Sequence, residues 1–357
     1  MATRLTNTQY STQKFQHTPP YYGKIPLQEP RVTQPKTTWS ISDPATGHRR
    51  QAECLASALS AGQYTHHAIM LRKPWSWLAP KHIFLPQLGV PKDFMHALQT
   101  APPQIAVGCG RQAAFVTRIL RTYGTYTLQI LHPRTDVSFW DIVIAPTHDR
   151  ITAPTIIPVI GSLNAIDDSW LIQGRTQFPM FADLPRPRIG VLLGGPTHQV
   201  PWSPAGLRAF SAELSTYLQR NGGSVMMTSS RRTPQWWYAA VNSQLHDCPQ
   251  TIWSPEHTTP NPYAGILGWS DIIVATCDSV NLLSEACSTR RPVLGAFMQQ
   301  ARGKMRRFIT ELQHRQRLCS ALPIWPTQQS YEPIREIQRV VRRLRHHPSS
   351  PLREDER

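Results

Sequence analysis

Three short turns in the second half of the sequence carry residue types that bind phosphate groups. They are "GGPTH" at 194–198, "SSRRTP" at 229–234 and "CDS" at 277–279, and each follows an apolar run typical of a strand. Adjacent glycines let a ligand approach the backbone closely, and arginine matches phosphate oxygens with paired donors. A tight turn or surface charge would explain any one of these turns. Three of them in one domain favour a site for a diphosphate.

The stretch "DSVNLLSEACS", which continues the third turn, has the pattern of a short amphipathic helix. At about 100° per residue, Asp278, Asn281, Glu285 and Ser288 lie on one polar stripe. One interpretation is a helix that Asp278 caps and whose polar stripe faces solvent. The other is a ligand site, in which the N–H groups that begin the helix receive a phosphate and Glu285 accepts a hydrogen bond from a sugar or ribose hydroxyl. Asp278 would repel an anion, so in that site it positions the loop or binds hydroxyls.

The turn "SDPATGHRRQ" at 42–51 places a histidine at the start of a predicted helix. Gly47 eases the turn, and a helix N-terminus favours the neutral imidazole that a general base requires, so His48 is a candidate base. A surface histidine that caps the helix is the alternative. A second turn on the same side, "GCGRQ" at 108–112, offers Arg111 to an acidic group.

Neither a dinucleotide cofactor nor a metal ion is expected. "GCGRQ" lacks the third glycine and the downstream acidic residue of the dinucleotide fingerprint, and the sequence has no Walker loop. The histidine pairs at 66–67 and 346–347 are adjacent residues that cannot face one ion from a regular element, and no companion ligands lie nearby. The six cysteines form no C-x-x-C pair, so we expect reduced and mostly buried thiols.

Short apolar strands alternate with helical patterns around these turns, which predicts parallel sheets built from β-α-β units. We therefore expect an α/β protein with two doubly wound, Rossmann-like domains, at 37–176 and 189–330, joined by a linker at 177–188. In such sheets ligands bind beyond the carboxyl ends of the strands, here in the cleft between the domains. Residues 1–36 are expected to be a disordered extension, and residues 331–357 a C-terminal helix and basic tail.

The chain of 357 residues has 38 basic and 22 acidic side chains, for a formal charge of +16. Such an excess favours an anionic partner, namely nucleic acid, a membrane surface or a phosphorylated substrate. The sequence has no recognised nucleic-acid-binding motif and no platform of aromatic and basic residues, so nucleic acid is not expected. Four arginines in "RVVRRLR", residues 339–345, indicate that the tail rests on anionic lipid.

The sequence has no apolar run near the roughly 20 residues that a membrane span needs. The N-terminus lacks the apolar block of a secretory signal. We therefore expect a cytoplasmic protein, peripheral at the inner face of the membrane through its basic tail.

The ordered motifs "TGHRRQ", "GGPT", "SSRRTP" and "NPYAGILGWSDIIVATCDSVNLLSEA" resemble the family of the plant elongated-mitochondria fission factor. Bacterial relatives of that family include proteins labelled as nucleoside-diphosphate-sugar epimerases. The resemblance covers roughly residues 38–325. Family members look like glycosyltransferases of the GT-B fold, with the donor nucleotide in the C-terminal domain and the acceptor on the N-terminal side. The glycosyltransferase of cell-wall lipid synthesis is similar in layout.

The resemblance also implies a set of site residues. On the acceptor side it implies Asp43, Gly47, His48 and Gln51, with His48 as the candidate catalytic base. The turn at 108–112 adds Arg111 to this side. The resemblance further implies a nucleotide-sugar site formed by Gly194, Gly195, Ser230, Arg231, Arg232, Thr233, Asp278, Ser279 and Glu285. The chain departs from the family at Asn281, where a serine is usual, and at "TRRPV", residues 289–293, where "TGKPV" is usual.

The function that the resemblance implies is a metal-independent, glycosyltransferase-like activity with a nucleotide-diphosphate sugar as donor substrate and an envelope or lipid-linked acceptor. In that activity His48 would take the proton of an acceptor hydroxyl. Two alternatives stay open. One is a nucleoside-diphosphate-sugar epimerase on the same fold, which would convert the donor without an acceptor. The other is a non-catalytic peripheral membrane or scaffold protein, as the fission-factor relatives suggest.

Overall fold

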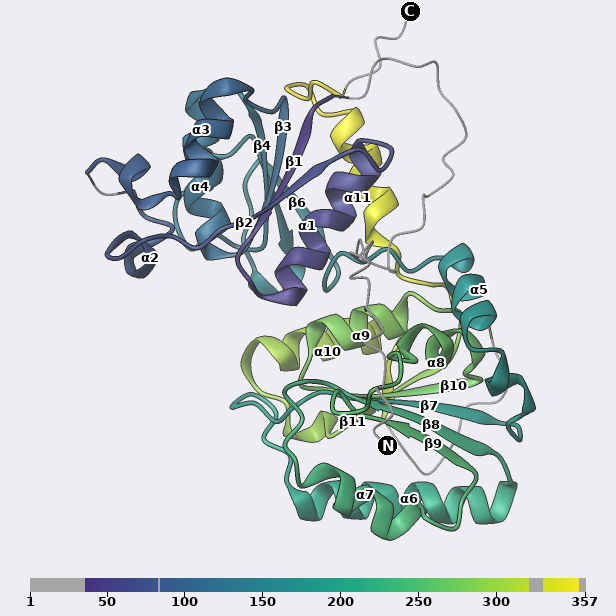
Figure 1. Cartoon of the computed structure of the whole chain (residues 1–357). Coiled ribbons are helices and arrows are strands. Elements are labelled where there is room, and N and C mark those ends of the chain that lie inside the picture. The colour runs from purple at the N-terminus through teal and green to yellow at the C-terminus, as the bar shows by residue number, and fades with distance from the viewer. Residues whose placement is uncertain (1–35, 83, 321–329, 353–357) are drawn as a thin grey trace, which may run out of the picture.

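Two six-stranded parallel sheets with helices on their faces make up the protein (Figure 1). The computed structural model describes residues 36–82, 84–320 and 330–352. The predicted extension at 1–36 therefore lies outside the described residues, apart from residue 36. The prediction of an α/β protein with two doubly wound, Rossmann-like domains is confirmed.

The first sheet has the strand order β2-β1-β3-β4-β5-β6. Its strands are β1 (Thr38–Ser42), β2 (Thr65–Ala68), β3 (Ile105–Cys109), β4 (Tyr126–Ile130), β5 (Ile142–Pro146) and β6 (Ile156–Val159). The helices of this half are α1 (Thr46–Leu59), α2 (Trp75–Leu78), α3 (Lys92–Thr100) and α4 (Arg111–Thr122). Strands such as β5, "IVIAP", are buried along their whole length. Continuous apolar runs of this kind are what a parallel sheet covered on both faces requires.

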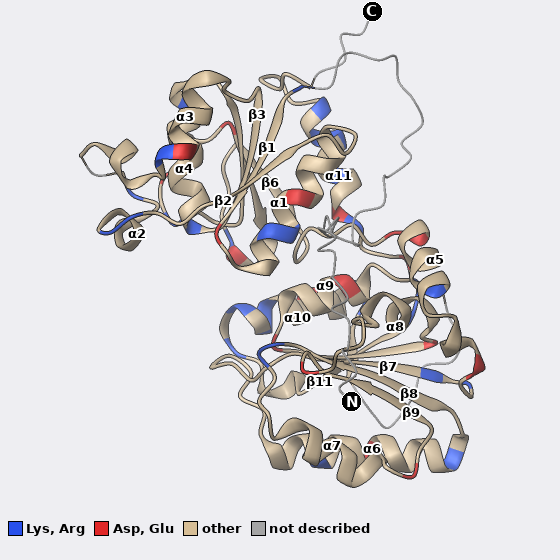
Figure 2. Ribbon diagram, viewed as in Figure 1, with Lys and Arg blue, Asp and Glu red and all other residues tan. Residues whose placement is uncertain are grey.

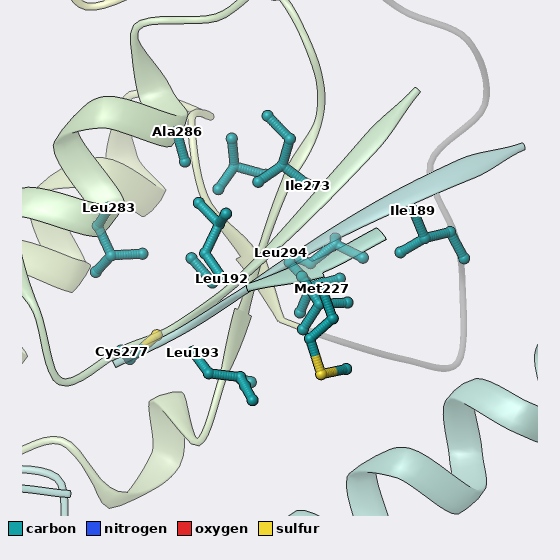
Figure 3. Close-up of a cluster of buried hydrophobic side chains, with 14 of the residues drawn as sticks. Ile189, Leu192, Leu193, Met227, Ile273, Cys277, Leu283, Ala286 and Leu294 are labelled. Atoms are coloured by element: carbon teal, nitrogen blue, oxygen red, sulfur yellow. The ribbon is translucent and has the colours of Figure 1, made fainter. Parts of the chain in front are cut away.

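The second sheet has the strand order β12-β11-β10-β7-β8-β9. Its strands are β7 (Arg188–Leu193), β8 (Ser224–Ser229), β9 (Gln250–Trp253), β10 (Ile272–Thr276), β11 (Val293–Ala296) and β12 (Cys319–Ser320). The helices are α5 (Asp168–Gln177), α6 (Pro204–Asn221), α7 (Trp237–Leu245), α8 (Tyr263–Trp269), α9 (Val280–Cys287) and α10 (Gly303–His314). Figure 3 shows the core between β7, β10 and α9, where Leu192, Ile273 and Leu283 are fully buried.

Each sheet has a topological switch point, where neighbouring strands send their connections to opposite sides. In the second sheet the chain starts at β7, adds β8 and β9 on one side, and then places β10 on the other. In the first sheet β1 lies between β2 and β3 in the same way. Ligands of open α/β sheets bind beyond the carboxyl ends of such strand pairs. A ligand is therefore expected beyond the carboxyl ends of β7 and β10 and of β1 and β3.

The helix α5 packs on the second sheet, although the sequence assigned residues up to 176 to the first domain. Leu171 and the neighbouring Phe181 belong to the hydrophobic core of the second sheet. α5 also packs against α8. This contact requires the glycine at 174, because a Cβ there would lie 2.3 Å from the carbonyl oxygen of Ala264 in α8. The expected linker at 177–188 therefore forms part of the second unit, and the chain crosses between the units at 160–167.

The last helix, α11 (Glu336–Arg345), returns to the first sheet and lies beside α1 (Figure 1). Ile337, Val340 and Leu344 are buried in one hydrophobic cluster with Ile105 and Leu128 of the first sheet. No helix of the described residues is long and apolar enough to cross a membrane.

Candidate functional site

The three predicted turns meet at the carboxyl edge of the second sheet. They follow β7, β8 and β10. The hydroxyl of Thr233 donates a hydrogen bond to the carbonyl oxygen of Gly194, and the amide of Gly195 donates to Asp278 Oδ2 at 2.9 Å. Hydrogen bonds thus join the three turns into one structure at the switch point of the sheet.

Asp278 is the buried centre of this structure, with a side chain that is 0% exposed. Besides Gly195, its carboxylate accepts a hydrogen bond from Trp202 Nε1 at 3.1 Å and faces Arg232 at 3.4 Å. Burial raises the pKa of Asp278, and these hydrogen bonds and the arginine oppose that rise. Asp278 therefore positions the loops.

Ser279 is the N-cap of α9, in place of the Asp278 cap that the sequence suggested. Its hydroxyl accepts a hydrogen bond from the amide of Leu282 at 3.4 Å. The carboxylate of Asp278 is turned back toward the glycine turn, so it cannot cap the helix. The N-terminus of α9 consequently has a neutral cap at the edge where the three turns meet.

The two glycines of the first turn are required by contacts within the protein. A Cβ at Gly194 would lie 2.1 Å from Asp278 Oδ2, and a Cβ at Gly195 would lie 2.2 Å from the carbonyl oxygen of Arg232. The sequence suggested that these glycines allow a ligand to approach the backbone. In the structure the groups that approach them belong to the other two turns.

The turn after β8 presents two arginines. Ser230 Oγ lies 3.1 Å from Thr233 Oγ1 and accepts a hydrogen bond from the amide of Arg232 at 3.2 Å, which fixes the turn. The guanidinium of Arg231 donates to Thr46 Oγ1 at the start of α1. The side chain of Arg232 is 55% exposed despite its ion pair with Asp278. Both arginines are accessible to an anion at this edge.

On the facing edge of the first sheet, Asp43 and His48 form a hydrogen-bonded pair. Asp43 Oδ1 lies 2.9 Å from His48 Nδ1, and it also accepts from the amide of Ala45 at 3.0 Å. Gly110, after β3, has a φ of +90°, and a Cβ there would lie 2.5 Å from His48 Nδ1. When Nδ1 donates to Asp43, Nε2 is the nitrogen that can take a proton.

The hydrogen bond between Asp43 and His48 and the role of Gly110 were not predicted from the sequence. The sequence placed Asp43 and His48 on the same side without a contact between them, and it gave Gly110 no role of its own. A pattern in the sequence could have indicated the pair: an aspartate and a histidine five residues apart after one strand, with a glycine after the neighbouring strand.

The other residues of the expected acceptor side lie in different surroundings. Gln51 is buried, and its amide donates to the carbonyl oxygen of Gly47 at 3.3 Å, which supports the first turn of α1. Gly47 faces α9, because a Cβ there would lie 2.5 Å from Asn281 Nδ2. Arg111 donates hydrogen bonds to the carbonyl oxygens of Ser76 and Trp77 at 3.1 and 3.3 Å, so its guanidinium holds helix α2 in place.

The polar stripe of α9 packs against the first unit, so the interpretation as a solvent-facing stripe is wrong. On the stripe, Ser288 Oγ donates a hydrogen bond to Asn164 Oδ1 at 3.1 Å. Beside it, Ser284 Oγ accepts a hydrogen bond from the amide of Ser162 at 3.0 Å. These partners belong to the segment through which the chain crosses between the sheets. Figure 2 shows an acidic segment of α9 opposite a basic segment of α1.

Glu285 is the acidic residue of this contact, and its side chain is 12% exposed. One carboxylate oxygen accepts a hydrogen bond from the hydroxyl of Tyr263, and the other lies 3.9 Å from Arg50 of α1. Burial raises the pKa of Glu285, while Arg50 and Tyr263 oppose the rise. Together with Asn164, these residues line a small pocket between the two units.

Among the described residues, no three His, Cys, Asp or Glu side chains are grouped so that they could hold a metal ion. All six cysteines are free thiols; five are buried and Cys319 is exposed.

Two doubly wound sheets whose carboxyl edges face each other define an α/β protein of the GT-B fold. Residues 46–347 match the family model described as "Mitochondrial fission ELM1". The chain belongs to this family.

Two relatives and one solved structure illustrate the match. The chain is 29% identical over 273 residues to Mitochondrial fission protein ELM1 of Arabidopsis thaliana, covering 68% of this chain and 63% of the plant protein, which is less than two thirds of its length. It is 23% identical over 349 residues to Uncharacterized protein RP120 of Rickettsia prowazekii (strain Madrid E), covering 85% of this chain and 96% of the Rickettsia protein. The UDP-GlcNAc 2-epimerase of Methanocaldococcus jannaschii superposes with a TM-score of 0.54 at 12% identity, covering 87% of this chain and 100% of that one.

Proposed function

We propose that this protein binds a nucleotide-diphosphate sugar between the facing carboxyl edges of its sheets and transfers the sugar to an acceptor hydroxyl. The observation that carries the proposal is that the switch points of both sheets face each other. One offers the arginine turn and the N-terminus of α9, and the other offers the Asp43–His48 pair. The archaeal protein with the same fold is a UDP-GlcNAc 2-epimerase. Its name supports a UDP-sugar as the first ligand to test.

In this proposal the second sheet holds the donor. Arg231 and Arg232 bind the diphosphate and stabilise the negative charge that grows on it as the bond to the sugar breaks. The first amides of α9 point their dipoles at the same group. Glu285 borders the pocket beside α1 and orients sugar or ribose hydroxyls.

The first sheet supplies the base. His48 Nε2 takes the proton of the acceptor hydroxyl while the acceptor oxygen forms its bond to the anomeric carbon and the nucleoside diphosphate leaves with its electron pair. Asp43 holds the ring through Nδ1 and stabilises the imidazolium that results. The transfer proposed here, with the donor bound by the second sheet and the base on the first, requires no cofactor.

Isothermal calorimetry with UDP-, GDP-, ADP- and CMP-sugars tests donor binding. Arg231→Ala should weaken binding of the preferred donor by about 10- to 100-fold, because a charge-assisted hydrogen bond to phosphate is lost. Arg220→Ala is the matched control, since Arg220 is an exposed arginine near the end of α6, before β8 and so away from the carboxyl edge. If no nucleotide sugar binds below millimolar concentration, the proposal is wrong.

Turnover separates the proposed chemistry from its alternatives. His48→Ala should leave donor affinity within about twofold and lower the transfer rate by about 10²- to 10⁴-fold, the usual contribution of a general base. Conversion of bound donor without any acceptor would instead identify an epimerase. Donor binding without turnover in any acceptor screen would favour the scaffold alternative.

A further inference from the structure

One segment of the first unit holds most of the exposed apolar surface. Among the described residues eleven large apolar side chains are exposed, and six of them lie between residues 70 and 88. They are Met70 (69%), Trp77 (64%), Leu78 (43%), Phe84 (73%), Leu85 (60%) and Leu88 (54%). Singly exposed apolar residues need no explanation, but a concentration of this kind marks a surface that something covers.

The charge of this segment is of one sign. No acidic residue occurs between Glu53 and Asp93, whereas Arg72, Lys73 and Lys81 lie within the segment. Lys73 Nζ lies 5.3 Å from the centre of the Trp77 ring, so basic and aromatic groups are adjacent. Figure 2 shows basic segments on both sides of α2.

The segment is held in place by the body of the protein. The guanidinium of Arg111 donates to the carbonyl oxygens of Ser76 and Trp77. Arg118 donates to the carbonyl oxygen of Pro80 at 2.9 Å, and the amide of Leu71 donates to Gln112 Oε1 at 2.8 Å. The exposed apolar side chains are therefore presented by a braced loop that projects beyond β2, the edge strand of the first sheet (Figure 1).

We propose that residues 70–82 and 84–88, the α2 segment, dock on an anionic lipid bilayer. Tryptophan, phenylalanine and leucine enter the boundary between headgroups and acyl chains, while the lysines and Arg72 bind anionic headgroups. Charge complementarity selects this occupant over a protein, because lysine is depleted from protein–protein interfaces and enriched at membrane surfaces.

The docking surface lies on the same edge of the first sheet as Asp43 and His48. The α2 segment follows the carboxyl end of β2, and the pair follows the carboxyl end of β1, which runs parallel to it. Docking therefore places the acceptor side at the membrane. This consequence, a lipid-linked acceptor, rests on the proposed function, whereas docking itself does not.

Vesicle co-sedimentation of the full chain tests the docking surface. Vesicles of phosphatidylcholine with phosphatidylserine should bind the protein, and phosphatidylcholine alone should bind it more weakly. The triple variant Trp77→Ser, Phe84→Ser, Leu85→Ser should lose about tenfold or more of its vesicle affinity, because these side chains no longer leave water. The melting temperature should stay unchanged, since all three side chains are exposed.

Two matched variants make the test specific. Ile172→Ser with Met180→Ser removes exposed apolar side chains elsewhere and should bind vesicles like the wild type. Arg342→Gln with Arg343→Gln removes exposed charges of α11, the basic tail that the sequence suggested as the lipid contact. Because α11 lies beside α1 and outside the α2 segment, this variant should change vesicle affinity less than twofold.

Several outcomes would overturn the proposal. They are wild-type binding by the triple variant, loss of binding in the tail variant alone, and absence of vesicle binding by the wild type. A wild-type dimer that the triple variant dissolves, without vesicle binding, would identify a protein interface instead. A transfer activity unaffected by the triple variant would leave docking intact and refute only the lipid-linked acceptor.

Discussion

Gly194 lies where the turn after β7 meets the buried carboxylate of Asp278. Asp278 cannot move away, because its oxygens hold the amide of Gly195 and the indole of Trp202. An alanine at 194 would place its Cβ 2.1 Å from Asp278 Oδ2. We expect Gly194→Ala to lower the free energy of unfolding by about 1–3 kcal/mol, the cost of overpacking a buried site. Urea denaturation measures this change.

Gly206→Ala is the control for this substitution. Gly206 lies in the first turn of α6, and the nearest atoms to a Cβ there are at 3.5 Å, an ordinary contact. Alanine should be neutral or stabilise the protein by up to about 1 kcal/mol, because it restricts the unfolded chain. Equal losses at the two positions would contradict a clash specific to Asp278.

Glu285 makes stability depend on pH. Burial raises its pKa above the ordinary value of 4.5. Between the unfolded and folded pKa values the folded state holds more protons, so the stability associated with this group is present below the unfolded pKa and is lost as the pH rises through the folded pKa. Glu285→Gln stays neutral, so its stability relative to the wild type should improve between about pH 4 and about pH 7.

Urea denaturation at both ends of that range measures the effect. Glu213→Gln, at an exposed position of α6, controls for the general effect of removing a negative charge. A difference between the Glu285 variant and the wild type that does not change with pH would contradict the prediction.

At the scale of elements, the start of α1 lies against the start of α9. Among the described residues outside α1, the atoms within 4 Å of a Cβ at Gly47 belong to the side chain of Asn281, the nearest at 2.5 Å. Gly47→Ala should therefore be unfavourable in the wild type and close to neutral when Asn281→Ala has removed the amide. A double-mutant cycle should give a coupling of about 0.5–1.5 kcal/mol. Additive changes would show that the two helix starts do not touch.

The sequence predicted the elements whose own pattern determines them. Strands such as "IVIAP" and "IGVLLGG" are continuous apolar runs, and the turns after β7, β8 and β10 were all located. It missed features that depend on which segments meet. The crossing of α5 and α8 depends on Gly174 meeting Ala264. Neither interpretation of the polar stripe of α9, a solvent-facing surface or a ligand site, included its contact with residues 160–166, because these partners are distant in sequence.

At the scale of the whole molecule, several sets of contacts between described residues join the two units. The polar stripe of α9 binds the crossover segment, Arg231 reaches Thr46, and α10 binds the loop after β5 through Lys304 and Arg307. These contacts are polar, whereas the hydrophobic cores of the two sheets share no residues. The units are therefore expected to unfold as separable cores, joined where the site lies.

Helix α11, which packs on the first sheet, allows a direct test of whether the two cores unfold separately. Leu344 is fully buried in the core of the first sheet, so Leu344→Ala should destabilise that unit by about 2–5 kcal/mol. In native-state hydrogen exchange, the amides of β3 and β4 should then exchange at least about tenfold faster, while those of β7 and β10 keep their protection. Leu214→Ala, fully buried in α6 on the second sheet, should do the reverse. If each variant lowers protection equally in both sheets, the two cores unfold as one, and the polar contacts at the site couple them more strongly than their chemistry predicts.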